Sequence, residues 1–437
     1  MRKSVSLFTG AGGLDIGLEA AGFETAVAVE IDKWACRTIR ANRDWPLIED
    51  DIHNVSSQNL KKMGQFNRDF PDLLIGGPPC QPFSKSSYWV TGDSKRLDDP
   101  RAGTLSAFLR VLRDLQPKVF LLENVEGLTF NGKDEGLQLI KNMIPKINKE
   151  MGSRYRVWWK ILNAADYGVP QIRERVYLIG SKDGKCFKFP EPTHANPELF
   201  RNDLFPKAPW KTAWDAIGDL VDSTEMEDQL LTVGGKWGDL LPSIPEGKNY
   251  LFHTEREQGL PLFGWRAHYW GFLLKLAKDR PSWTLQSQPG TAIGPFHWDN
   301  RKLTPRELCR IQSLPDNYHI TGSRTEVQRQ VGNAVASLMG EILGREIREQ
   351  LFGDTLPNSD LLLNLKRRYP IPEPNLHHRV PDKYLHLAGH YAAHPGTGRG
   401  REACRRKQEL LTKLLDVDGS NIPARKPITL LQHYWNF

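Results

Sequence analysis

Cys80 stands in the segment with the clearest chemical potential, Gly-Gly-Pro-Pro-Cys-Gln-Pro-Phe-Ser at residues 76–84. The segment follows Asp72–Ile75, an apolar run that predicts a buried strand. A solitary cysteine is usually a small buried hydrophobe, but the glycines and prolines around this one fix the loop and expose the thiol. Because ligands of α/β proteins bind at the carboxyl ends of strands, we interpret Cys80 as a nucleophile that acts as a thiolate.

Glu123 follows the next apolar run, Val119–Leu122, and begins the tripeptide Glu-Asn-Val. A carboxylate at the end of a buried strand is often only a cap or the start of a helix. Here we expect it to share the sheet edge with Cys80, where it could hydrogen-bond a ring nitrogen of a substrate.

Arg173 and Arg175 alternate with Glu174, so a strand would place both guanidinium groups on one face. Two forked cations on one face suit a substrate carbonyl, a phosphate or a structural ion pair with a carboxylate. The pattern is compatible with all three.

A nucleoside-cofactor site is indicated by the glycine turn Leu7–Gly13, which follows one predicted strand and precedes a helix. Glycines there allow a tight turn and a close approach of the backbone to a ligand. Glu30 ends the second predicted strand, where a carboxylate would bind ribose hydroxyls, and Asp51-Ile52 ends a third segment and could contact an adenine. The turn lacks the full Gly-x-Gly-x-x-Gly of a dinucleotide fold, which disfavours NAD.

The elements that must position these residues lie between residues 4 and 180, where short apolar runs alternate with helical patterns. Strands that alternate with helices predict a parallel, doubly wound α/β sheet. The expected strands are Val5–Phe8, Ala26–Glu30, Asp72–Ile75, Val119–Leu122 and Arg175–Gly180, and the expected helices include Trp34–Ala41 and Leu105–Leu115.

From about Ser181 prolines and tryptophans become frequent and periodicity fades until Leu303, which predicts a second region with much irregular backbone. Thr304–Leu314 and Thr325–Leu351 are again predicted to be helical. The tail after Gly353 contains two clusters of basic residues.

Composition narrows the class of protein. The net charge of +7 fits a polyanionic partner or simply a solvated surface. Five scattered cysteines without a Cys-x-x-Cys spacing argue against a disulfide framework or a zinc knuckle, and for a reducing compartment. No stretch approaches the roughly 20 apolar residues of a membrane span. We therefore expect a soluble, cytoplasmic protein that does not act at a membrane.

Taken together and in order, these motifs resemble those of the bacterial DNA cytosine-5 methyltransferase family, of the restriction–modification type. The resemblance covers roughly residues 4–350. It is carried by Phe8–Gly13, Glu30, Asp51, Pro78-Pro79-Cys80-Gln81, Glu123-Asn124-Val125, Gln171-x-Arg173-x-Arg175, Arg301–Glu307 and Gly332-Asn333-Ala334-Val335. The chain departs from the common pattern at Ser6, where many members have Asp, and at Ile31, where some have an aromatic residue.

The resemblance implies an α/β fold: a doubly wound, Rossmann-like methyltransferase sheet with a smaller, irregular target-recognition domain. It divides the chain into a catalytic and cofactor-binding domain (1–180, completed by 320–352), a target-recognition domain (181–319) and a basic C-terminal extension (353–437). Arg266, His268, Trp270 and Arg280 are candidates to read the bases. The extension would contact phosphates or pack on the smaller domain. A metal site at His386, His390 and His394 is disfavoured by the nearby Pro395, and we expect no metal.

The cofactor implied is S-adenosyl-L-methionine. Phe8 would pack on its adenine, Gly10 and Gly12 would lie under its methionine portion, Glu30 would bind the ribose, Asp51 the adenine amino group and Ile52 its ring. The full set of expected cofactor-binding residues is Phe8, Gly10, Gly12, Gly13, Leu14, Glu30, Ile31, Asp51, Ile52, Pro79, Leu105, Asn333 and Val335.

The reaction implied is transfer of a methyl group to carbon 5 of a cytosine that has been flipped out of double-stranded DNA. Cys80 would add to carbon 6, Glu123 would hydrogen-bond ring nitrogen 3 and the amino group, and Arg175 would hold the carbonyl oxygen, supported by Arg173. The polar segment Ser84–Arg101 would close over the base, although it could be a simple surface loop.

Three other functions are alternatives to DNA cytosine-5 methylation. An amino-methylating DNA enzyme would have an Asp/Asn-Pro-Pro-Tyr type tetrad in place of Pro-Pro-Cys-Gln. An RNA methyltransferase remains open, although the large 181–300 region disfavours it. A DNA-binding regulator would not need Cys80, Glu123 and a cofactor pocket together. We expect a monomer that protects host DNA beside a cognate restriction endonuclease without forming a stable complex with it; a solitary methylase would have the same sequence features.

Overall fold

The computed structural model describes residues 1–66, 70–79, 103–129, 135–198, 207–220, 228–264, 270–357 and 359–390. Contacts divide the chain into two compact units, Met1–Tyr250 with Ala267–Pro381, and Leu251–Arg266 with Asp382–Phe437. The site lies in the first unit. In the second, the described residues include the short helix α12 (Asp382–Leu385), and the Gly389 amide donates to the Pro261 carbonyl at 3.1 Å.

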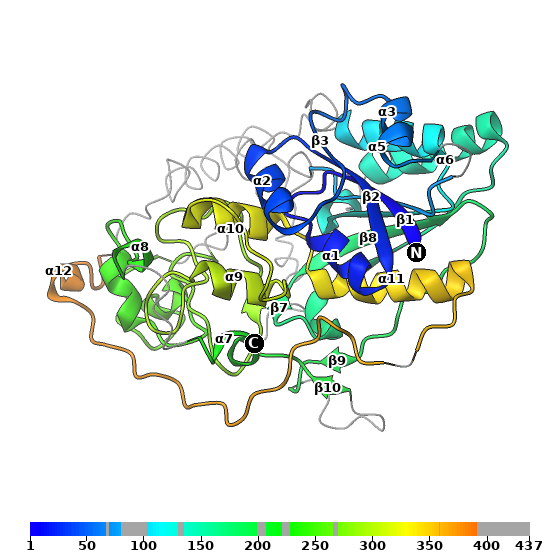
Figure 1. The fold of residues 1–437 in the computed structure, drawn as a ribbon. Helices are drawn as coiled ribbons and strands as arrows, with labels where there is room; N and C mark the ends of the chain where they lie inside the picture. The colour runs from blue at the N-terminus through cyan, green and yellow to red at the C-terminus, as the bar shows by residue number, and fades with distance from the viewer. Residues whose placement is uncertain are drawn as a thin grey trace, which may run out of the picture. The chain divides into compact units, whose positions relative to one another are not determined.

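A seven-stranded sheet forms the frame of the first unit, in the order β3-β2-β1-β4-β5-β8-β6 (Figure 1). Its strands are β1 (Arg2–Leu7), β2 (Phe23–Glu30), β3 (Leu47–Glu49), β4 (Leu73–Gly76), β5 (Val119–Val125), β6 (Arg156–Asn163) and β8 (Glu174–Ser181). The neighbours from β3 to β5 pair in parallel, whereas β8 is antiparallel to both β5 and β6. The expected fold class is confirmed, and the expected parallel sheet has one reversed strand.

Helices cover both faces of this sheet. The helices after the first strands are α1 (Gly13–Ala20), α2 (Lys33–Asn42), α3 (Ser57–Met63), α5 (Gly103–Leu115) and α6 (Glu135–Met151). Two short 3-10 helices follow strands, η3 (Glu126–Thr129) after β5 and η4 (Ala164–Tyr167) after β6. Alternate residues of β1 point to opposite faces. Val5 and Leu7 join α5 and α6 in one apolar cluster, while α1 packs with α11 (Ser337–Phe352) in the other.

The predicted helix Thr325–Leu351 is two helices, α10 (Arg324–Asn333) and α11. Ala334 and Ala336 have extended backbone at the break, with ψ angles of 150° and 123°. No proline marks this break in the sequence, so helical periodicity predicted a continuous element. The break brings the segment 333–335 to the carboxyl edge of the sheet, beside the glycine turn.

The described residues between 207 and 300 contain little regular structure, as the sequence predicted. The described elements between β8 and α9 are β9 (His194–Ala195), β10 (Ala208–Pro209), α7 (Ala213–Ile217), α8 (Asp228–Leu231), η5 (Gly238–Ser243), η6 (Tyr250–His253) and β11 (Ser282–Trp283), which pairs with β7 (Gln171–Ile172). The apolar core of this region contains residues of α7 and of α9 (Pro305–Ile311). Within it, Trp214 packs on Trp298 with ring centroids 5.9 Å apart.

Residues 359–378, here called the strap, run without helix or strand from the end of α11 to the region around α7 and η5. At its start, the Leu362 and Leu363 amides donate to the buried Glu341 carboxylate of α11 at 2.7 and 2.9 Å. Further along, Arg367 forms an ion pair with Asp215 of α7 at 2.7 Å. Near its end, Asn375 accepts a hydrogen bond from the buried Lys278 at 2.8 Å.

In the described residues, no helix is both long enough and apolar enough to cross a membrane.

Candidate active site

The glycine turn after β1 has a backbone that only certain residues adopt easily. Phe8, Gly10 and Gly12 have φ angles of 55°, 57° and 76°. Gly12 is the residue before α1, and glycine adopts this left-handed conformation without strain. Phe8 is not a glycine, so its positive φ is a local strain of the kind that concentrates at ligand sites.

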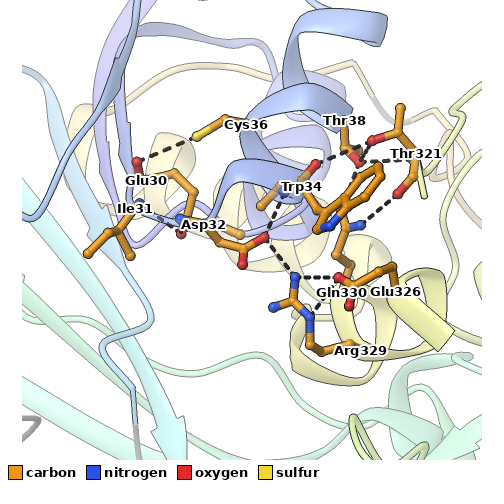
Figure 2. A network of polar contacts seen from close by, with 12 residues as sticks. Glu30, Ile31, Asp32, Trp34, Cys36, Thr38, Thr321, Glu326, Arg329 and Gln330 are labelled. Carbon is orange, nitrogen blue, oxygen red and sulfur yellow. Dashed lines mark hydrogen bonds and ion pairs between the residues drawn. The ribbon is translucent and has the colours of Figure 1, made fainter. Parts of the chain in front are cut away.

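Glu30, at the end of β2, closes the other side of this turn. One carboxylate oxygen accepts the Gly10 amide at 2.6 Å. The other accepts the amides of Ile31 and Asp32 at 2.9 and 2.8 Å (Figure 2). Glu30 is 8% exposed. Burial raises the pKa of its carboxyl, and the hydrogen bonds from these amides partly oppose this shift. The carboxyl group is therefore fixed in direction by three backbone amides.

A polar network beyond Glu30 joins this part of the sheet edge to α10 (Figure 2). Arg329 of α10 contacts Asp32 at 2.8 Å and Glu326 at 2.7 Å, and the Asp32 side chain also accepts the Ala35 amide at the start of α2. Thr38 of α2 donates to Gln330 of α10 at 2.7 Å. The α2–α10 contact thus positions the segment that follows α10.

Asp51 and Ile52 lie after β3 as expected, with different environments. The Asp51 carboxylate accepts the amide of His53 at 2.9 Å and contacts its ring Nδ1 at 2.6 Å, which lowers the pKa of Asp51. Ile52 is buried in the same apolar cluster as Leu105 of α5. Ile31, in contrast, is 62% exposed.

Glu123 lies at the end of β5 and is 9% exposed. The Arg175 Nε is 3.1 Å from its carboxylate, across the antiparallel β5–β8 pair. Burial raises the pKa of Glu123, and the two arginines of β7–β8, Arg175 first, oppose the shift. The raised pKa makes this carboxyl easier to protonate than a free Glu side chain. A protonated carboxyl can both donate and accept a hydrogen bond.

The loop towards Cys80 is tied to this strand. The side-chain amide of Asn124 donates to the Pro78 carbonyl at 3.2 Å, and a Cβ on Gly77 would lie 3.2 Å from the Glu123 carboxylate. Pro78 is buried and Pro79 is exposed. Cys80 itself lies outside the described residues, as does the predicted loop 84–101.

Arg173 and Arg175 have separate partners. The Arg173 guanidinium donates to the carbonyls of Gly332 and Ala334, at 3.0 and 2.9 Å, in the connection between α10 and α11. Gln312 donates to the same Ala334 carbonyl and pairs with Gln171 at 2.5 Å. These buried groups fix the backbone that carries Asn333 and Val335.

One cavity brings seven of the predicted site residues together. The predicted residues that line it are Phe8, Gly10, Gly13, Leu14, Glu123, Asn333 and Val335. Its wall does not include Glu30, Ile31, Asp51, Ile52 or Leu105, which belong to the neighbouring ends of β2, β3 and the start of α5. The glycine turn, the buried Glu123 and the connection between α10 and α11 therefore lie around one cavity.

Sequence reasoning missed two residues of this region, Asp15 and Gln312. Asp15 lines the cavity although it is only 1% exposed, and its signal was an acid in the first turn of a helix directly after the glycines. Gln312 is fully buried and carried no such signal. Of the base-reading candidates, Trp270 is 37% exposed and packs on Trp283, Arg280 pairs with Asp279, and Arg266 and His268 lie outside the described residues.

The described part of the chain contains no group of three or more His, Cys, Asp or Glu residues placed to hold a metal ion.

The fold and the cavity at the carboxyl edge of the sheet define an α/β nucleoside-cofactor enzyme. The model of the C-5 cytosine-specific DNA methylase family matches residues 2–349, so the chain belongs to this family. It is therefore an enzyme that uses S-adenosylmethionine as its methyl donor.

Individual relatives agree with this assignment. The chain is 38% identical over 384 residues to the type II methyltransferase M.SacI of Streptomyces achromogenes, covering 81% of this chain and 96% of that protein. It is 35% identical to the type II methyltransferase M.NgoFVII of Neisseria gonorrhoeae, with 76% and 83% coverage. A solved structure of a mutant of Spodoptera frugiperda DNMT2 shares the fold, with a TM-score of 0.52 at 18% identity, covering 80% of this chain and all of that one.

Proposed function

We propose that this enzyme methylates carbon 5 of a flipped-out cytosine in one short sequence of double-stranded DNA, through a covalent adduct of Cys80. Carbon 5 of cytosine is a weak nucleophile, so addition of the thiolate to carbon 6 has to precede methyl transfer. The resulting enamine attacks the methyl donor, and loss of the carbon 5 proton then expels the thiolate.

The observation that carries the proposal is the buried Glu123 beside the Cys80 loop. Burial raises the pKa of this carboxyl. In its protonated form it would donate to ring nitrogen 3 and accept from the cytosine amino group as negative charge develops in the ring. Asn124 holds the Pro78 carbonyl, so strand β5 and the loop that leads to the thiol are positioned by neighbouring residues.

Arg173 and Arg175 would have different roles. Arg175, 3.1 Å from Glu123, would bind the cytosine carbonyl oxygen next to that carboxyl. Arg173 is 3% exposed and binds two backbone carbonyls, so we assign it to positioning the Asn333–Val335 segment of the cofactor pocket. Phe8, Glu30 and Asp51 would bind the adenosine part of the cofactor.

The role we propose in the cell is protection of DNA from a cognate restriction endonuclease, because the relatives are named type II methyltransferases. Residues 181–319 would read the recognition sequence. The irregular backbone of the described residues in this range and the partly exposed Trp270 suit a surface that contacts DNA through loops.

The test is conversion sequencing of plasmid DNA from cells that express the chain, with a Cys80→Ser variant beside it. Protection of cytosines in one short context, lost in the variant, is the expected result. Cys186→Ser is the matched control, since Cys186 is an exposed thiol that follows β8 in the chain and does not line the cavity. Protection by Cys80→Ser would exclude the covalent mechanism, and unprotected DNA with well-expressed protein would redirect the search to RNA.

A further inference from the structure

Asp15 is a buried acid that the proposed mechanism does not use. It lies in the first turn of α1 and is 1% exposed. The Thr25 hydroxyl of β2 donates to its carboxylate at 3.4 Å, and Ser6 of β1 also hydrogen-bonds it. Two neutral hydroxyls stabilise a buried carboxylate only weakly, because neither carries a charge to oppose its own.

The cavity that Asp15 lines is the one that contains Glu123 and the Asn333–Val335 segment. Glu30 and Asp51, the proposed ribose and adenine ligands, do not line it. When Glu30 and Asp51 bind the adenosine part, the methionine part of the cofactor and its reactive sulfur extend into the cavity, towards Asp15 and Glu123. This step rests on the proposed placement of the cofactor.

The charges around Asp15 are few. On its own helix Glu19 lies one turn away and is paired with Arg43 at 2.8 Å. Tyr318 faces it from the segment after α9, and Glu341 of α11, which packs on α1, is paired with Arg345. Across the cavity, Glu123 is paired with Arg175. Among the described residues, no cation forms an ion pair with Asp15, so a ligand could supply that charge.

The cofactor and its product differ in charge at this end. The methionine part of S-adenosylmethionine carries a sulfonium, an ammonium and a carboxylate, a net charge of one positive. After methyl transfer the sulfur is a neutral thioether, and the homocysteine part has no net charge. We propose that Asp15 is the residue that distinguishes S-adenosylmethionine from S-adenosylhomocysteine, by placing a carboxylate where only the cofactor brings a compensating positive charge.

Burial raises the pKa of Asp15 to about 7, with Glu19 adding to the shift and Ser6 and Thr25 opposing it. In the empty protein the carboxyl is therefore largely protonated below pH 7. Binding of the cationic cofactor favours the carboxylate, so it releases a proton to solvent, whereas the neutral product does not. The preference for the cofactor should consequently rise with pH up to about 7 and then level off.

The test is calorimetric titration of the full chain, without DNA, with S-adenosylmethionine and with S-adenosylhomocysteine. Measurements at pH 6 and pH 8, in buffers of different ionisation enthalpy, give affinities and the protons released. For the wild type we expect proton release at pH 6 with the cofactor only. Asp15→Asn, which has the same shape, should abolish that release and reduce the cofactor-to-product preference at pH 8 about tenfold.

Glu19→Gln is the matched control, because it removes an acid one turn along the same helix and outside the cavity lining. It should retain the preference for the cofactor. Proton release should still occur with the cofactor only, but with a smaller amount at pH 6, because Glu19 contributes to the raised pKa of Asp15. An equal loss of affinity for both ligands in Asp15→Asn would mean a structural role and overturn the proposal. So would proton release that persists in this variant, which would assign it to Glu123 or the ligand. Wild-type protein that binds neither ligand would instead contradict the proposed cofactor site.

Discussion

At the scale of single residues, the chemistry depends on carboxyl groups that the fold removes from water. Glu123 and Asp15 line the same cavity, and burial raises the pKa of both. Their partners differ, since Glu123 has a guanidinium 3.1 Å away and Asp15 has only hydroxyls. The two groups are therefore expected to respond differently to substitution.

Glu123→Gln should lower the rate of methyl transfer by about 10²–10⁴-fold, because an amide cannot supply a proton to the cytosine ring. DNA binding should change little, since most of that affinity comes from phosphate contacts elsewhere. Single-turnover transfer of labelled methyl groups measures the rate, and a gel shift measures binding. Glu126→Gln, one turn further along the chain, is the control; an unchanged rate in Glu123→Gln would remove this residue from the mechanism.

Asp15 should also make the stability of the empty protein depend on pH. Its pKa is about 7 in the folded protein against 3.8 for an unperturbed Asp, so between these values the unfolded chain binds fewer protons. The free energy of unfolding should thus fall as pH rises through this window, by up to a few kcal/mol. Asp15→Asn lacks this decline. Denaturant unfolding at pH 5 and pH 8 compares the two proteins, and a difference independent of pH would contradict the assignment.

At the scale of elements, the site depends on the contact between α1 and α11. Gly13 begins α1, and a Cβ there would collide with the Val335 carbonyl just before α11. The close approach of these two segments forms one wall of the cofactor cavity.

Gly13→Ala should therefore destabilise the protein by about 1–3 kcal/mol through overpacking and weaken cofactor binding. Gly234→Ala is the matched control, because an added Cβ meets no atom within 4 Å and its φ is not positive. Thermal unfolding and cofactor titration of both variants provide the comparison. A Gly13→Ala variant that binds the cofactor like the wild type would show that this wall tolerates a shift.

The sequence predicted the strands that carry the site, because apolar runs and glycine turns are local signals. It did not predict that β8 runs against its neighbours, since strand direction is set by the connections of the whole sheet. Nor did it predict the separate partners of Arg173 and Arg175: alternation describes a regular strand, and here β7 ends at Ile172 and β8 begins at Glu174. The carbonyls that Arg173 binds come from residues more than 150 positions away.

At the scale of the whole molecule, the strap connects α11 of the catalytic sheet to the irregular region at 207–300. Arg367 binds Asp215 at 2.7 Å and the Pro209 and Trp210 carbonyls at 2.8 Å. Lys278 is held at once by Glu246 at 2.7 Å, by the Glu373 carbonyl at 3.1 Å and by Asn375 at 2.8 Å. The strap thereby completes two buried polar clusters in the region proposed to read DNA.

Arg367→Ala should lower the free energy of unfolding by about 1–3 kcal/mol, because it leaves the buried Asp215 carboxylate without its cation. Sequence discrimination should weaken with it, while methyl transfer at saturating DNA is retained. Arg379→Ala, an exposed arginine beyond the strap, is the control. Chemical denaturation and methylation of matched and mismatched duplexes would check both effects; discrimination equal to the wild type would confine the strap to stability.

The strap also sets an order of events when the protein is made. Arg367 follows Asp215 by 152 residues, and Asn375 follows Lys278 by 97. A ribosome adds roughly 5–20 residues per second. Asp215 and Lys278 are therefore synthesised several seconds or longer before their partners in the strap. During that interval the proposed DNA-reading region of the nascent chain lacks these partners, and its buried polar clusters can form only after the strap has been synthesised.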